Sequence, residues 1–171
     1  RESADPEYPG ISVADYKAVR ERAMGGRPLK KLGLVGYTIM PLPVFDGLKR
    51  DLPEVELVRA DQTLLSLRAI KSENEIACMK RAFEISEIAV QAVLDEMRPG
   101  MTELQVIGIA QREMYKHGAE YEGHALYCFC GPATNNAISR PTQNTIKANE
   151  VIQLNLGARI SGYSSSVGLP V

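Results

Sequence analysis

The sequence contains 171 residues, enough for one medium domain or two small ones. Its 20 basic and 21 acidic residues give a formal net charge of −1 at pH 7, and its pI is about 6.2. Nothing in this balance suggests a nucleic-acid-binding protein, which needs a clustered basic surface. No apolar run approaches the roughly 20 residues of a membrane-spanning helix, and the N-terminus lacks the apolar segment of a secretion signal. We therefore expect a cytoplasmic protein with no nucleic-acid or membrane partner.

The first third of the chain predicts a small layered domain. Its pattern indicates a helix over 12–24, a buried strand over 32–37, a short helix over about 41–52 and a strand over 55–58. Ser12 is the expected N-cap of the first helix. Strands that alternate with helices favour parallel pairing. We place this domain at residues 1–66 and a second unit at residues 67–171.

The second unit opens with two long helices. Ser72 and Glu75 form a capping box, so a helix is expected over 73–97. Thr102 begins a second capping box, and the helix that follows runs to about His117. The remaining pattern predicts a strand over 126–130, a loop over 131–144, and a hairpin with strands over 150–158 and 160–167.

The three cysteines form an odd set with no disulfide-framework spacing. Cys78 falls on a helical pattern and is expected in the core. Cys128 and Cys130 alternate along a strand and share one face. We expect all three to be reduced structural thiols, as is usual in the cytoplasm.

Six segments of the chain resemble, in order and spacing, the creatinase, aminopeptidase P and prolidase family of pita-bread, M24-type hydrolases. They are Arg68-Ala69-Ile70-Lys71-Ser72, Glu75-Ile76 with Arg81-Ala82, Arg98-Pro99-Gly100-Met101-Thr102-Glu103, Gly118, Cys130-Gly131-Pro132, and Glu150-Val151-Ile152-Gln153-Leu154-Asn155. The resemblance implies an α/β (α+β) fold. Residues 1–66 would be the C-terminal part of a creatinase-like N-terminal domain. Residues 67–171 would be the first half of a pita-bread catalytic domain.

The chain departs from this family at three functional positions. The family's metallopeptidases carry two metal-binding aspartates in the hairpin, where this sequence has Asn155 and Ser166. The family's catalytic histidine position is reached by counting back from Asn155 and forward from Gly131, and both counts give Ile138. The family's remaining ligands, a histidine and two glutamates, would fall in a second half beyond Val171.

These departures change the expected chemistry. Asn and Ser offer only neutral oxygens, whereas a dinuclear site needs carboxylates to neutralise and bridge its ions. We therefore predict no cofactor and no metal at this hairpin. A divalent ion such as manganese, cobalt or zinc is expected only if a compensating site lies downstream. Creatinase works without metal, and it also carries Leu-Asn where this chain has Leu154-Asn155.

Other residues must then supply any acid–base chemistry. His124 precedes the strand that approaches the pocket and is the candidate catalytic base, with a solvated loop histidine as the alternative. His117 is expected to be structural, as a cation near a helix C-terminus. The candidate substrate pocket comprises Ile138, Arg140, Asn155, Tyr163 and Ser166. Within it Arg140 is either a carboxylate clamp or a solvated loop residue, and Tyr163 either contacts ligand or packs in the hairpin.

Three functions remain open. The first is hydrolysis of an amide, amidine or Xaa-Pro-like C–N bond in a small molecule or short peptide, without the usual dinuclear metal. The second is a catalytically inactive pita-bread module that binds such a ligand. The third is an inactive piece of a longer hydrolase. The family resemblance implies a homodimer, and the sheet edge of a half domain favours self-association, so this chain alone is expected to dimerise or aggregate.

Overall fold

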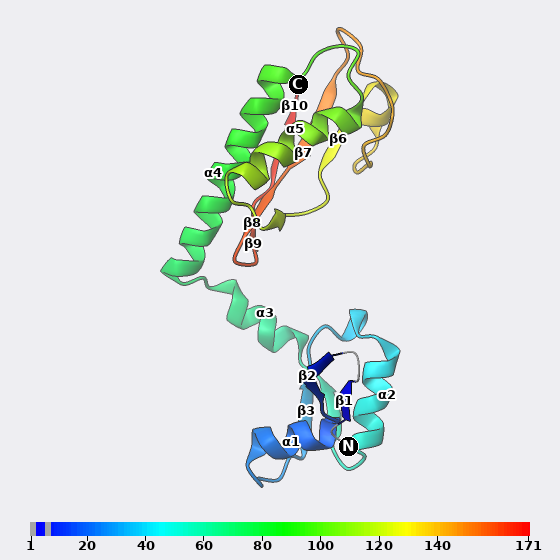
Figure 1. The fold of residues 1–171 in the computed structure, drawn as a ribbon, viewed down its shortest axis with the longest axis vertical. Helices are drawn as coiled ribbons and strands as arrows, with labels where there is room; N and C mark the ends of the chain where they lie inside the picture. The colour runs from blue at the N-terminus through cyan, green and yellow to red at the C-terminus, as the bar shows by residue number, and fades with distance from the viewer. Residues whose placement is uncertain (1–2, 6–7) are drawn as a thin grey trace. The chain divides into compact units, whose positions relative to one another are not determined.

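The computed structural model describes residues 3–5 and 8–171, which form two compact units that divide between Ile70 and Lys71 (Figure 1). The sequence placed the join between residues 66 and 67. The difference arises because helix α3 (Asp61–Ala69) is continuous across that point. Within the described residues, no helix combines the length and apolar character needed to cross a bilayer.

The first unit combines short strands and helices. Its elements are β1 (Ser3–Asp5), β2 (Tyr8–Val13), α1 (Tyr16–Met24), β3 (Lys31–Leu34), the 3₁₀ helix η1 (Tyr37–Ile39), α2 (Leu42–Asp51), β4 (Glu56–Arg59) and α3. Strands β3 and β4 are parallel, which confirms the predicted pairing. Leu34, Leu48, Leu52 and Val55 form the centre of its small core.

Two predicted boundaries in this unit are wrong. Ser12 belongs to strand β2, and Asp15 is the N-cap of α1, where its Oδ1 accepts a 2.8 Å hydrogen bond from the backbone N of Ala18. The strand predicted over 32–37 ends at Leu34 because Gly36 adopts a left-handed conformation with φ 77°. The Asp61 carboxylate stabilises that turn by accepting a 2.8 Å hydrogen bond from the backbone N of Gly36.

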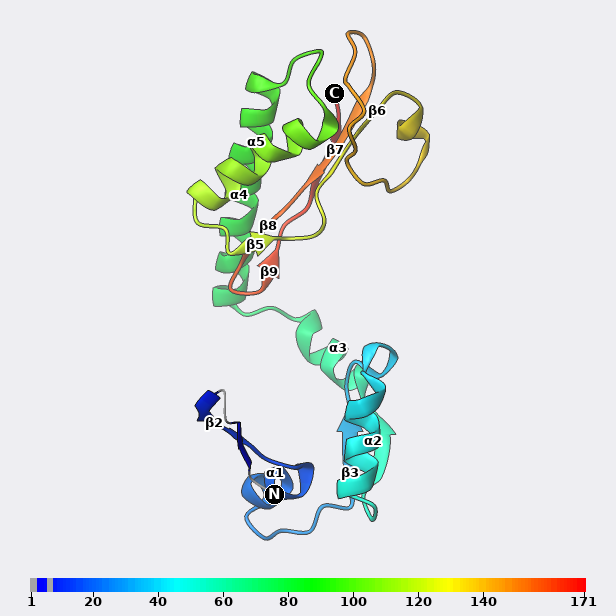
Figure 2. The same cartoon turned by 45° about the vertical axis from the view of Figure 1, so that its right-hand side comes forward.

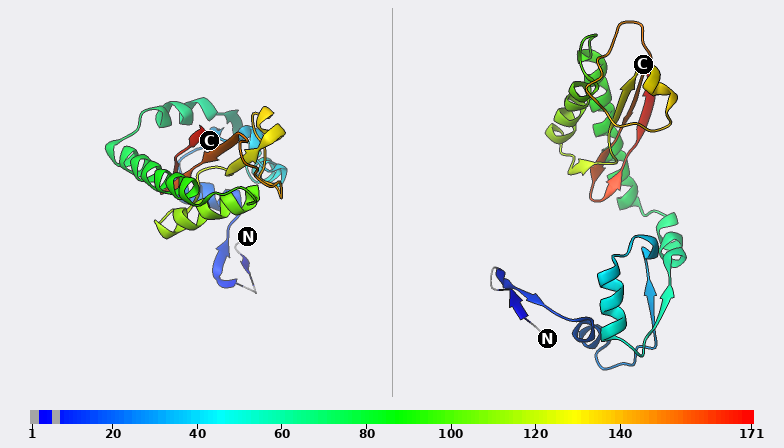
Figure 3. Two further views of the ribbon diagram at one scale, coloured as in Figure 1. Left: turned by 90° about the horizontal axis from the view of Figure 1, so that it is seen from above. Right: turned by 90° about the vertical axis from the view of Figure 1, so that its right-hand side faces the viewer.

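The second unit packs two helices on one side of its strands (Figures 2 and 3). Its elements are α4 (Glu73–Glu96), α5 (Glu103–Lys116), β5 (Tyr121–Glu122), β6 (Tyr127–Cys130), the 3₁₀ helix η2 (Gly131–Asn135), β7 (Ile152–Leu156), β8 (Ala158–Ile160), β9 (Tyr163–Ser164) and β10 (Val167–Pro170). The strands form two antiparallel sheets with orders β10-β7-β6 and β5-β8-β9. Both predicted capping boxes are confirmed, Ser72 with Glu75 and Thr102 with Gln105.

The core of this unit lies between the helices and one face of the strands. Alternate residues of β7, Ile152, Leu154 and Leu156, are buried and cluster with apolar residues of α4 and α5. The intervening residues Gln153 and Asn155 are only partly buried. Since side chains alternate along a strand, Asn155 lies on the sheet face that turns away from the helices.

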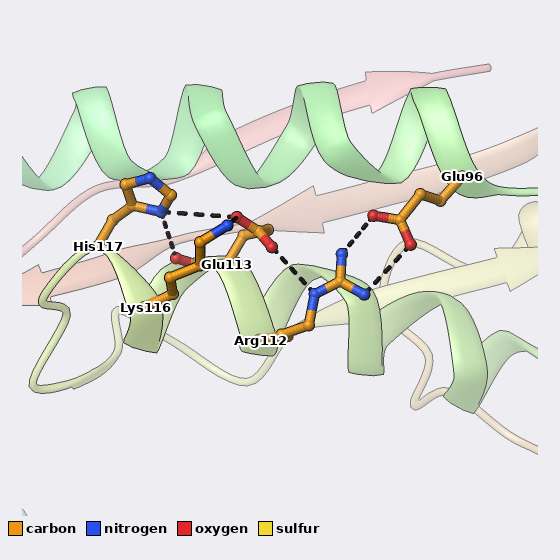
Figure 4. A network of polar contacts seen from close by, with 5 residues as sticks. All are labelled: Glu96, Arg112, Glu113, Lys116 and His117. Carbon is orange, nitrogen blue, oxygen red and sulfur yellow. Dashed lines mark hydrogen bonds and ion pairs between the residues drawn. The ribbon is translucent and has the colours of Figure 1, made fainter.

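A polar network also connects the two helices (Figure 4). Arg112 of α5 makes hydrogen bonds to both carboxylate oxygens of Glu96 on α4, and its Nε donates to Glu113 at 2.9 Å. Lys116 Nζ lies 3.0 Å from Glu113 Oε2. His117 Nδ1 is 2.9 Å from the Glu113 backbone oxygen, which gives this histidine a structural contact at the end of α5. The network thus joins the partly exposed side chains of Arg112 and Glu96 to the buried carboxylate of Glu113.

All three cysteines are free thiols. Cys128 and Cys130 are buried in one cluster, which confirms that they share a face of β6. Burial raises the pKa of Cys128 to about 12 and that of Cys130 to about 11, so both thiols stay protonated. Cys78 is only half-buried, so its expected place in the core is wrong.

Candidate functional site

The structure brings Asn155 and Ser166 together. Asn155 lies on β7, the central strand of its sheet, and Ser166 directly precedes β10. Asn155 pairs with Gly168, so Ser166 is its diagonal neighbour two residues along the partner strand. The hydroxyl of Ser166 donates a 3.0 Å hydrogen bond to Asn155 Oδ1. These two residues form a local polar pair on the sheet face that turns away from the helices.

The donor set of this pair does not fit two divalent metal ions. Both side chains are neutral, and Asn155 Oδ1 already accepts one hydrogen bond from Ser166. A dinuclear site needs carboxylates that bridge the ions and neutralise their charge. Across residues 3–5 and 8–171, no three His, Cys, Asp or Glu side chains form a group that could hold a metal ion.

Tyr127 extends the polar pair across the sheet. It lies on β6 directly opposite Asn155, so the two side chains share a face. On the other side of Asn155, Gly168 has no side chain, and a Cβ placed there would lie 3.8 Å from the Asn155 amide carbon. The surface around Asn155 is therefore open on the β10 side and bounded by an aromatic ring on the β6 side.

His124 adjoins this surface through its contact with Tyr127. The two rings stack with their centroids 5.7 Å apart. His124 Nδ1 lies 2.7 Å from the backbone oxygen of Ala125, and Nε2 is buried without a hydrogen-bond partner in the described part of the chain. A Cβ on Gly157 would approach Nε2 to 3.0 Å. In this conformation Nε2 is shielded from solvent and Nδ1 is engaged with Ala125, so neither ring nitrogen contacts Asn155.

His124 also lines a cleft of about 460 Å³ beside α5. Gln111 and Glu122 line the same cleft, and Gln111 Nε2 donates to Glu122 at 2.8 Å. Burial opposes ionisation of Glu122, but hydrogen bonds from its own backbone N–H, Gln111 and Tyr115 outweigh it and hold its pKa below the usual value. The carboxylate is thus stabilised in its charged form by neutral donors.

Tyr163 lies on β9, and its hydroxyl is hydrogen-bonded to another residue of the protein. Its hydroxyl donates a 2.6 Å hydrogen bond to Glu75 in the first turn of α4. That bond, followed by those from Ser72, lowers the pKa of Glu75 to about 2. Tyr163 therefore connects the hairpin to the start of α4. This contact agrees with the expectation that Tyr163 packs within the protein, and not with the alternative that it contacts a ligand.

Ile138 and Arg140 lie on the long loop after η2, and both are exposed. The exposed fraction of Ile138 is 70%. Within the described residues neither side chain hydrogen-bonds to Asn155 or Ser166.

The loop that carries Ile138 and Arg140 is anchored by Glu103, whose side chain is 1% exposed. Glu103 accepts hydrogen bonds of 2.8 Å from the N and Oγ1 of Thr142 and of 3.0 Å from the N of Cys130. Burial opposes ionisation of Glu103, but these bonds outweigh it and keep its pKa below the usual value.

Sequence reasoning did not single out Glu103, Ser165 or the role of Ser86. Glu103 is one residue after the N-cap of a helix, where a carboxylate is common and suggests no buried anchor. Ser86 did carry a signal in the sequence, because it is a hydroxyl residue at helical spacing from the apolar residues Phe83 and Val90. A buried hydroxyl requires a partner, and that partner is Ser165, whose Oγ lies 2.7 Å away.

Comparison with known proteins identifies the second unit. The family described as metallopeptidase family M24 matches residues 77–169. An Xaa-Pro dipeptidase of Pyrococcus horikoshii is 26% identical over 161 residues, which are 94% of this chain and 45% of that protein. An Xaa-Pro aminopeptidase of Escherichia coli is 29% identical over 103 residues, which are 59% of this chain and 23% of that protein. The chain therefore spans less than half the length of these relatives.

Solved structures show the same fold. A prolidase from Pyrococcus furiosus superposes with a TM-score of 0.81 at 21% identity, over 94% of this chain and 49% of that one. An X-Pro aminopeptidase from Thermotoga maritima gives a TM-score of 0.80 at 23% identity, over 92% of this chain and 44% of that one. At this identity the likeness establishes a mixed α/β fold of the pita-bread type, as the sequence predicted.

Proposed function

The chain belongs to metallopeptidase family M24, and from that premise we propose that it forms part of a hydrolase acting on the C–N bond of a small amide, amidine or Xaa-Pro-like peptide. Its substrate would bind on the sheet face that carries Asn155 and Ser166, without the usual dinuclear metal at this hairpin. The relatives named as an Xaa-Pro dipeptidase and an Xaa-Pro aminopeptidase support a short peptide as substrate.

The observation that carries this proposal is the hydrogen bond from Ser166 to Asn155. With Oδ1 accepting from Ser166, the Asn155 amide NH₂ is the donor that the pair offers to a ligand. Within the described residues, this NH₂ makes no hydrogen bond. An NH₂ group fixed in this way can donate to a carbonyl oxygen of a substrate, which is how neutral side chains stabilise developing negative charge.

His124 is the candidate base, because its ring stacks on Tyr127, which lies opposite Asn155. A base must reach the proton it removes or an intervening water. The buried Nε2 therefore requires the His124 ring to turn away from Gly157 before it can act. Catalysis by His124 would involve this rotation, whereas binding at Asn155 would not.

A hydrolysis panel tests the proposal. The protein in its full natural length is incubated with creatine, Xaa-Pro dipeptides and small amidines, with and without manganese. We expect turnover of one class that manganese does not stimulate and that falls in Asn155→Ala and His124→Ala, with Glu87→Gln as an exposed control. Metal-stimulated turnover would refute the proposed metal-free hydrolysis. Turnover that survives Asn155→Ala would refute the assignment of the face.

A second candidate is a module that binds the same ligands without catalysis. It is favoured by Ile138, an exposed apolar residue at the position where the family resemblance places a catalytic histidine. An aliphatic side chain cannot transfer a proton. Saturable binding of an Xaa-Pro dipeptide in calorimetry, lost in Asn155→Ala and unaccompanied by turnover of any panel compound, would select this alternative.

A further inference from the structure

The hairpin that presents Ser166 is interrupted at one place. The pairs Leu156–Val167 and Arg159–Ser164 keep a single register on the two sides of residues 157–158 and 165–166. At the interruption the backbone N of Ser165 still donates to the oxygen of Ala158 at 3.0 Å. The backbone N of Ala158 instead donates to two hydroxyls, Ser86 Oγ at 2.9 Å and Ser165 Oγ at 3.0 Å. A hydroxyl pair thus replaces one bond of the ladder.

This hydroxyl pair is buried and fully hydrogen-bonded. Ser86 is 0% exposed and Ser165 2%. Their oxygens are 2.7 Å apart, and Ser165 Oγ also lies 3.0 Å from the backbone oxygen of Ala82 on α4. One assignment satisfies every proton: Ala158 N–H donates to Ser86, Ser86 to Ser165, and Ser165 to Ala82. A buried hydroxyl without a hydrogen-bond partner destabilises the fold, so removal of one hydroxyl of this network disturbs the remaining hydrogen bonds.

The backbone on the other side of Ser165 is held by contact with two glycines. A Cβ on Gly157 would lie 2.2 Å from the Ser165 oxygen, and a Cβ on Gly123 would lie 2.7 Å from it. The carbonyl therefore rests directly on two Cα positions. Ser165 is fixed through its hydroxyl by α4 and through its carbonyl by Gly123 and Gly157.

We propose that Ser86 is a positioning residue for the Asn155–Ser166 pair. Ser86 holds Ser165 from the helix side, and Ser166 is the next residue, with its hydroxyl on Asn155. A shift of Ser165 therefore moves the donor that orients the Asn155 amide. The functional part of this inference rests on the proposed ligand face, because Ser86 matters to function only if Asn155 binds the ligand.

Nuclear magnetic resonance of the labelled chain tests the positioning directly. In Ser86→Ala we expect the Ala158 amide to exchange about tenfold faster, because one of its two acceptors is lost. We also expect the side-chain amide resonances of Asn155 to shift and broaden. Val93→Ala is the matched control, because it removes buried volume from α4 without touching the hydroxyl pair. In that control the Asn155 resonances should keep their wild-type positions.

A second pair of variants guards against general unfolding. Ser86→Thr retains the hydroxyl. Ser86→Val has the same shape as the threonine variant but lacks the hydroxyl. The Asn155 resonances should stay close to wild type in the threonine variant and be displaced in the valine variant. Unchanged resonances in Ser86→Ala, or equal displacement in Val93→Ala or in both Thr and Val variants, would overturn the proposal. The readout needs no substrate, so a failed hydrolysis panel would leave this result standing.

Discussion

The glycine at the hairpin interruption gives the sharpest stability prediction. Gly157→Ala places a Cβ 2.2 Å from the Ser165 oxygen and 3.0 Å from His124 Nε2. The first contact is far inside van der Waals distance and involves backbone, so relief requires the hairpin to move. Overpacking of a close-packed site costs about 1–3 kcal/mol, and a backbone clash belongs at or above the upper end of that range.

Gly108→Ala is the matched control, because the same change is made where nothing lies within 4 Å of the new Cβ. Gly108 is in the interior of α5, so alanine should stabilise the helix by about 0.5–1 kcal/mol. The two substitutions are therefore expected to have opposite signs.

Thermal unfolding followed by circular dichroism measures both effects. For a unit of about 100 residues, 1 kcal/mol shifts the Tm by roughly 4–8 °C. Gly157→Ala should thus lower the Tm of the second unit by about 10 °C or more, and Gly108→Ala should raise it by a few degrees. A Gly157→Ala protein as stable as wild type would refute the described packing of Ser165 on the glycines.

Three further predictions concern other contacts of the same unit. Tyr163→Phe removes the main cause of the low Glu75 pKa, so this pKa should rise from about 2 toward 4.5 in a carboxyl resonance titration. Because the pKa of Glu75 is lower in the folded state, the stability that Glu75 contributes is complete above about pH 4.5 and is lost as the pH falls toward 2. If Glu75 titrates in the variant as it does in the wild type, the hydrogen bond from Tyr163 is refuted. Glu103→Gln should cost about 1–3 kcal/mol in urea unfolding, because an amide NH₂ then faces the donors of Thr142 or Cys130, whereas the exposed Glu87→Gln should have little effect. The chain at micromolar concentration should scatter light as a dimer or larger species, and a monomer mass would contradict the self-association expected of its open sheet edge.

Local signals in the sequence were sufficient for part of the fold. Both capping boxes depend on residues three apart, and the β3–β4 pairing follows from the alternation of strands and helices, so these features could be predicted. The start of α1 could not, because Ser12 and Asp15 are both good caps and the strand at β2 decides between them. A capping rule applied to one helix alone does not account for the competition between that helix and the strand before it.

The buried face of α4 shows a different limit. Large apolar residues at helical spacing include Ile76 and Phe83, yet these are 42% and 39% exposed. The buried stripe instead uses Ala82 and Ala89, whose small side chains let the strands approach the helix closely. The spacing of large side chains along this helix therefore identifies only part of its buried face.

The candidate site was predictable only in part. The family resemblance placed Asn155 and Ser166 in one candidate pocket, and the structure places the two in hydrogen-bonding contact. The anchoring of Ser165 did not follow, because it depends on Ser86, Gly123 and Gly157, which meet only in the folded chain. Contacts of such sequence separation carry no local signal.

Manganese titration followed by electron paramagnetic resonance tests the central claim that Asn155 and Ser166 form a metal-free pair. The protein in its full natural length is compared with Ser166→Ala and with the double variant Asn155→Asp, Ser166→Asp. We predict no saturable Mn²⁺ binding that depends on Ser166 in the native protein, and a gain of binding in the double variant, because carboxylates supply the missing charge. Tight Mn²⁺ binding by the native protein that is lost in Ser166→Ala would contradict the claim.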